Sequence, residues 1–83
     1  MKERLLGYCV GNWDGELLHS RITVEAGAEL LRWAMHPNLA HVFPTRQAAE
    51  QCVRELERPD RFVVELYDVG DQWFVDWPEG VNV

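Results

Sequence analysis

Residues 61–77 read Arg-Phe-Val-Val-Glu-Leu-Tyr-Asp-Val-Gly-Asp-Gln-Trp-Phe-Val-Asp-Trp, and this stretch decides the fold. Two runs rich in β-branched and aromatic residues flank Gly70-Asp71, a pair suited to a two-residue type II′ turn. Such a turn sets the register of a β-hairpin over residues 61–77. With Val69 opposite Gln72, the predicted pairs continue as Asp68–Trp73, Tyr67–Phe74, Leu66–Val75, Glu65–Asp76 and Val64–Trp77.

Side-chain alternation divides this hairpin into two faces. We expect one face to lie under a helix in the core, and it carries Phe62, Val64, Leu66, Trp73, Val75 and Trp77. The other face is expected to point outward, and it carries Val63, Glu65, Tyr67, Phe74 and Asp76. On the outward face Glu65 lies directly opposite Asp76, an arrangement of like charges that destabilises a sheet.

The segment before the hairpin predicts an amphipathic helix over residues 45–57. Its apolar side chains recur at helical spacing and are Ala48, Ala49, Cys52, Val53 and Leu56. Thr45 supplies an N-cap hydroxyl, and Pro59 stops the helix. We expect Arg54 and Arg58 in the last turn, where cations suit the helix dipole.

The first half of the chain predicts strands at residues 4–10 and 16–24, joined by a turn at residues 11–15 that is rich in Gly, Asn and Asp. Residues 25–36 are ambiguous, because their composition suits a helix whereas Gly27 and Pro37 oppose one. A strand near residues 29–35 is favoured, and a helix stays open as the alternative. Together these elements predict a single α+β domain over residues 1–83, with one helix packed on a small antiparallel sheet and a loose tail at 78–83.

Charge restricts the class of partner. Eight Lys and Arg oppose 14 Asp and Glu, a net charge of −6, so the chain is acidic. Residues 62–83 contain Glu65, Asp68, Asp71, Asp76 and Glu79 but no Lys or Arg. This acidic end disfavours direct contact with nucleic acid and favours a partner protein with a basic surface. The same surplus of acid also suits simple solubility, and that interpretation stays open.

Motifs for catalysis or metal binding do not stand out. The spacing of His19, His36 and His41 fits no zinc pattern, and Cys9 and Cys52 are expected to be buried free thiols. The chain has no apolar run long enough to span a membrane and no secretory leader, which favours the cytoplasm. We therefore expect no enzyme activity, no cofactor, no metal and no membrane contact.

The candidate partner-binding residues are the acids and aromatics of the C-terminal part, namely Glu65, Tyr67, Asp68, Asp71, Phe74, Asp76 and Glu79. Carboxylates beside aromatic rings suit Arg or Lys through charge-assisted hydrogen bonds and cation–π contacts. A solvated face with no partner is the alternative, and the turn around Trp13 is a second candidate surface.

Residues 40–50 read Ala-His-Val-Phe-Pro-Thr-Arg-Gln-Ala-Ala-Glu and precede a helix and a hairpin containing Trp73. Over residues 40–77 this pattern resembles small acidic accessory proteins of bacteriophages and prophages, including anti-CRISPR proteins. The resemblance carries over no functional residue. It implies an inhibitor in the host cytoplasm that occupies a basic, nucleic-acid-binding surface of a host defence complex. The alternative is a small structural or regulatory homodimer in which exposed aromatic residues form the contact.

Overall fold

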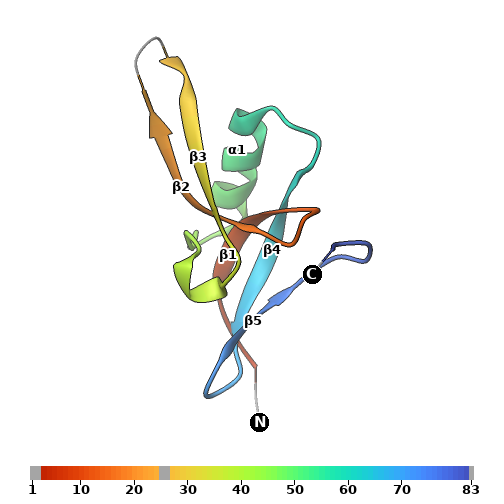
Figure 1. Ribbon diagram of the computed structural model, residues 1–83. Helices are drawn as coiled ribbons and strands as arrows, with labels where there is room; N and C mark the ends of the chain where they lie inside the picture. The colour runs from red at the N-terminus through yellow and green to blue at the C-terminus, as the bar shows by residue number, and fades with distance from the viewer. Residues whose placement is uncertain (1–2, 25–26, 83) are drawn as a thin grey trace.

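The computed structural model describes residues 3–24 and 27–82 (Figure 1). Within these residues the elements are β1 (Arg4–Asn12), β2 (Leu17–Thr23), β3 (Glu29–Ala34), the 3-10 turn η2 (Pro37–Leu39), α1 (Arg46–Leu56), β4 (Arg61–Asp68) and β5 (Trp73–Asp76). The strands form one antiparallel sheet in the order β3-β2-β1-β4-β5, and α1 packs on it. The predicted α+β class is therefore confirmed.

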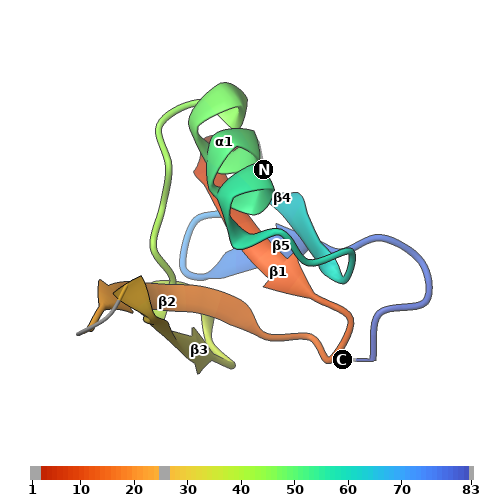
Figure 2. The same ribbon diagram turned by 90° about the horizontal axis from the view of Figure 1, so that it is seen from above.

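The sheet has a long central ladder and a diverging arm. β1 and β4 pair from Arg4–Asp68 to Asn12–Arg61, although the two strands are far apart in sequence. β2 meets β1 only at the pair Gly11–Leu17, and then turns away together with β3 (Figure 2). We call the described residues of these two strands and their connection, 17–24 and 27–34, the β2–β3 arm. β3 decides the ambiguous segment in favour of a strand over residues 29–34, while Glu25 and Ala26 lie outside the described residues.

The C-terminal hairpin has the predicted register. The Val69 amide donates to the Gln72 carbonyl oxygen at 3.0 Å, and Gly70 adopts φ 115°, which glycine tolerates. The ladder pairs Asp68–Trp73, Tyr67–Phe74, Leu66–Val75 and Glu65–Asp76. It ends there, because the Trp77 amide donates to the Val75 carbonyl oxygen at 3.1 Å and the chain turns away. The predicted pair Val64–Trp77 is therefore wrong.

The helix covers the opposite face of β4 from the one predicted. Val10 and Val63 are paired on the face that α1 covers, and Val10 packs with Cys52 of the helix. The face of Val64 and Leu66, which was expected under the helix, packs instead against the start of β2 and the end of the hairpin. The prediction failed because β4 is an inner strand with apolar residues on both faces, so alternation does not say which face a helix covers.

Two apolar clusters follow from this arrangement, one on each face of the β1–β4 ladder. The first contains buried Cys9, Leu17, Val64 and Leu66, with Leu6, Ala40, Phe62, Val75 and Trp77 packed against them. The second contains buried Val10, Leu18 and Cys52, with Leu31, Trp33, Phe43, Val53 and Leu56 around them. Trp73 was predicted in the core but is 44% exposed, because it lies near the hairpin turn, beyond both clusters and against η2.

The helix ends as capping chemistry requires. The Thr45 hydroxyl accepts a hydrogen bond from the Ala48 amide at 3.1 Å, which confirms the N-cap. At the other end Glu57 adopts the left-handed conformation, and its amide donates to the Arg54 carbonyl oxygen at 3.3 Å. The last turn contains Arg54, whereas Arg58 lies past the cap, contrary to expectation. The helix thus ends at Leu56, before Pro59 can interrupt it.

The tail after β5 returns toward the turn between β1 and β2. The Asn82 amide donates to the Trp13 carbonyl oxygen at 2.9 Å, while Val83 lies outside the described residues. Gly11 allows close packing nearby, since a Cβ at this position would lie 2.7 Å from the Trp77 ring.

Among the described residues no helix has the length and hydropathy needed to cross a bilayer.

Candidate functional site

The face of the hairpin that carries Glu65, Tyr67, Phe74 and Asp76 brings four of the predicted site residues together. We call these four residues the acidic–aromatic face. Tyr67 stacks on Phe74 with ring centroids 5.4 Å apart and an angle of 18° between the planes. The Tyr67 hydroxyl donates to Glu65 Oε1 at 3.2 Å, and Glu65 pairs directly with Asp76. The predicted cross-strand carboxylate pair and its aromatic neighbours are therefore present.

Arg46, at the start of α1, changes the electrostatics of this face. Its Nη2 lies 3.6 Å from Glu65 Oε2, and its guanidinium carbon lies 5.2 Å from the centroid of the Tyr8 ring. Glu65 is therefore partly neutralised, whereas Asp76 is exposed and has no ion pair within the described part of the chain. Among the described residues the cross-strand pair therefore has a single unpaired carboxylate, that of Asp76.

The sequence contained a signal for Arg46 that the prediction did not use. Arg46 precedes the buried Ala49 by three residues, and residues at this spacing share one side of a helix. Because Ala49 faces the sheet, Arg46 is carried toward the sheet as well. Tyr8 is harder to anticipate, because its place beside Glu65 depends on the register of two strands that are far apart in sequence.

The Tyr67 hydroxyl is maintained as a donor by its surroundings. Desolvation raises the pKa of this phenol above its ordinary value, and the negative charge of Glu65 raises it further. The phenol is therefore protonated at neutral pH, and it donates this proton in the hydrogen bond to Glu65 Oε1. This hydrogen bond orients the Glu65 carboxylate beside Asp76.

The other three predicted residues are dispersed. The Asp68 carboxylate accepts a hydrogen bond from Arg4 Nη2 at 3.0 Å and another from the Gly70 amide at 2.8 Å. Alternation along the strand places Asp68 on the opposite face from Glu65. Asp71 is exposed in the hairpin turn, and Glu79 is exposed in the tail after Pro78. The seven predicted residues thus form one cluster of four, and three separate acids.

A cleft of about 430 Å³ opens beside the acidic–aromatic face, and we call it the edge cleft. Its lining consists of Trp13, Arg46, Phe62, Val63, Val64, Glu65, Asp76, Trp77 and Pro78. One wall is aromatic, because Phe62 lies 4.8 Å from Trp13 and 6.3 Å from Trp77 between ring centroids. The Trp13 turn and the acidic–aromatic face, two alternative surfaces at the sequence level, therefore border the same cleft.

The thiols are poorly suited to nucleophilic chemistry. Both cysteines are free and buried, as predicted. Burial raises the pKa of Cys9 to about 11. Burial also raises the pKa of Cys52, although the Arg21 guanidinium 3.8 Å from its sulfur opposes the shift. Both groups are therefore thiols at neutral pH, the less reactive form. Residues 3–24 and 27–82 contain no group of three or more potential His, Cys, Asp or Glu metal ligands.

Comparisons of the chain with protein-family models, curated proteins and solved structures found no match. The chemistry of the acidic–aromatic face and the edge cleft therefore supplies the basis for a functional proposal. Both features lie on the C-terminal hairpin and on the elements packed directly against it.

Proposed function

We propose that this chain is a non-enzymatic binding protein whose acidic–aromatic face receives a basic surface of another protein. The observation that carries the proposal is the exposed Asp76 carboxylate, which has no ion pair among the described residues and lies opposite Glu65 beside the Tyr67–Phe74 stack. An Arg or Lys of a partner would neutralise Asp76 and remove the repulsion between the two carboxylates. The stack offers the same cation an aromatic surface.

The proposed class of target is a basic surface that normally binds nucleic acid, as part of a bacterial defence complex. The net charge of −6 supports this, because an acidic chain competes with phosphates for cationic residues and is itself repelled by nucleic acid. The resemblance of residues 40–77 to bacteriophage accessory proteins suggests the same setting, in the cytoplasm of a host cell. Association would be fast at low salt and would slow as salt screens the two surfaces.

The test uses two double variants with the same change in charge. Glu65→Gln with Asp76→Asn removes the charges of the acidic–aromatic face, whereas Asp71→Asn with Glu79→Gln removes two dispersed acids. Wild-type and variant proteins are used as bait in a bacterial lysate, and each recovered protein is purified for kinetic measurements. We expect the first variant to bind about tenfold or more weakly, mainly through slower association, and with a smaller salt dependence. Equal binding by the two variants would contradict the proposal.

A homodimer is the second candidate, because the β2–β3 arm exposes apolar side chains. Ile22 and Leu30 face each other across the arm and are 42% and 51% exposed. The chain exposes 5734 Å² of surface, whereas a compact monomer of its mass exposes about 5100 Å². Light scattering at several concentrations separates the two candidates. A monomer at all of them would exclude the homodimer, and a dimer that Ile22→Ser with Leu30→Ser dissociates would support it.

A further inference from the structure

Half of β4 lies at an open edge of the sheet. β5 pairs with β4 only at residues 65–68, so residues 61–64 have β1 on one side and no strand on the other in the described part of the chain. The tail does not continue the ladder, because the chain turns away at Trp77. An unpaired strand edge presents amides and carbonyls that are ready to pair with another strand.

The hairpin register identifies which backbone groups face outward. Val69 and Gln72 form a hydrogen-bonded pair next to the turn. Backbone groups of alternate residues point to the same side of a strand, so those of Tyr67 and Glu65 are directed toward β5. Val63 continues this alternation, and its amide and carbonyl point past the end of β5 into the edge cleft.

The two walls of the edge cleft differ in chemistry. On the side of α1 lie the carboxylates of Glu65 and Asp76 together with Arg46, whose cation is already engaged by Glu65 and Tyr8. On the opposite side lie the rings of Trp13, Phe62 and Trp77. An extended strand directs successive side chains to opposite sides, so it presents different chemistry to each wall.

We propose that the edge cleft binds an extended segment of the partner protein as an additional β-strand along residues 61–64. A Lys or Arg of that segment reaches Asp76 and Glu65, and a neighbouring apolar residue packs on Trp13, Phe62 and Trp77. This inference rests on the proposed function and deepens it, since it specifies the conformation and the sequence pattern of what is bound. Backbone hydrogen bonds to Val63 supply affinity, and the two walls supply specificity.

The test uses a capped hexapeptide that alternates Val and Lys, and two analogues of it. One analogue is N-methylated at the three Val amides and the other at the three Lys amides. Because amides of alternate residues point to the same side of a strand, one analogue loses the hydrogen-bond donors that face β4, and the other keeps them. Binding to the intact chain is followed by NMR titration, together with hydrogen exchange of the Val63 amide. We expect the parent peptide to slow this exchange at least tenfold at saturation, and one methylated analogue to bind at least tenfold more weakly than the other.

Several outcomes would overturn strand addition. These are no binding of the parent peptide, unchanged exchange at Val63, or equal affinity of the two methylated analogues. Replacing Lys by Glu in the peptide and using the Glu65→Gln, Asp76→Asn variant tests recognition of charge separately. If these changes weaken binding while the two analogues bind equally, the proposed function stands and strand addition fails. If charge has no effect while the analogues differ, the acidic–aromatic face is not the recognition element, and the proposed function fails.

Discussion

The β1–β4 ladder and the outer part of the β2–β3 arm, beyond Leu17 and Leu18, belong to one sheet, yet they differ in burial. In the ladder, Cys9, Val10, Val64 and Leu66 are at most 2% exposed, and their side chains pack on both faces. The ladder is therefore stabilised mainly by the removal of apolar surface from water. It also contains the strand whose open edge forms the edge cleft.

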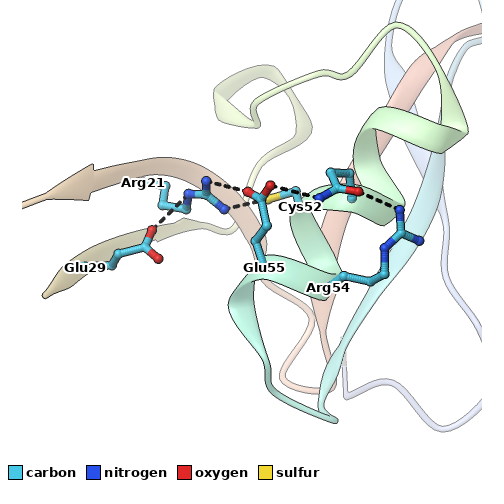
Figure 3. Close-up of polar contacts among 6 residues, drawn as sticks. Arg21, Glu29, Cys52, Arg54 and Glu55 are labelled. Carbon is cyan, nitrogen blue, oxygen red and sulfur yellow. Dashed lines mark hydrogen bonds and ion pairs between the residues drawn. The ribbon is translucent and has the colours of Figure 1, made fainter. Parts of the chain in front are cut away.

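Beyond Leu17, Leu18 and Ala34, which are buried, the arm has a polar contact with the rest of the molecule. Arg21 lies between Glu29 of the arm and Glu55 of α1, at 2.9 Å and 2.7 Å (Figure 3). Hydrogen bonds from Gln51 and then Arg21 lower the pKa of Glu55, so the carboxylate stays ionised. Membership of one sheet thus says little about how firmly each part is stabilised, because the ladder is buried on both faces and the outer part of the arm is largely exposed.

Truncating one leucine in each region should give the largest contrast. Leu66→Ala removes a fully buried side chain of the ladder and should lower the free energy of unfolding by about 2–5 kcal/mol. Leu30→Ala, on the outer side of the arm, should cost about 0.5 kcal/mol or less because the side chain is 51% exposed. Urea denaturation of both variants measures the difference. Equal losses would mean that the arm is as tightly packed as the ladder.

High pH should destabilise the ladder through Cys9. The folded-state pKa of about 11 lies above the value of 9.0 expected for an exposed thiol, so the native state retains this proton more strongly. The resulting stability is fully present below pH 9 and is lost as the pH rises through 11. The two-unit difference corresponds to about 2–3 kcal/mol.

Cys9→Ala isolates this contribution from the other groups that titrate in the same range. The free energy of unfolding of wild type and variant is measured at intervals of about half a pH unit between roughly pH 8 and 11. We expect the wild type to lose more stability than the variant over this interval. Parallel pH profiles would show that Cys9 is accessible to water in the native state.

Removing the ion pairs of Arg21 should have a small effect on global stability. Arg21→Gln breaks both ion pairs but should cost about 1 kcal/mol or less, because the groups are partly exposed and surface ion pairs contribute little. Hydrogen exchange should accelerate in β2 and β3 and stay unchanged in the β1–β4 ladder. Arg32→Gln, on the same arm, is the control for loss of charge alone. Similar acceleration by both variants would disprove the role of Arg21.

Most of the individual elements followed from local chemistry in the sequence. Gly70-Asp71 predicted the hairpin register because a two-residue turn leaves little freedom in pairing. Thr45 and the apolar stripe predicted the helix and its N-cap. The same local register placed Glu65 opposite Asp76 and Tyr67 opposite Phe74. The acidic–aromatic face was therefore predictable from the sequence, whereas the edge cleft was not.

The sequence by itself therefore determined the helix, the hairpin register and the acidic–aromatic face, since each depends on neighbours in the chain or across a short turn, whereas the choice of a strand at 29–34 needed the structure. Only the tertiary structure decided that α1 covers Val63 rather than Val64, and hence that Arg46 meets Glu65. It also decided that Trp13, Phe62 and Trp77 line one cleft. The physical reason is that alternation shows which residues share a face but not what packs on it. With apolar residues on both faces of β4, that choice depends on the packing of the whole chain.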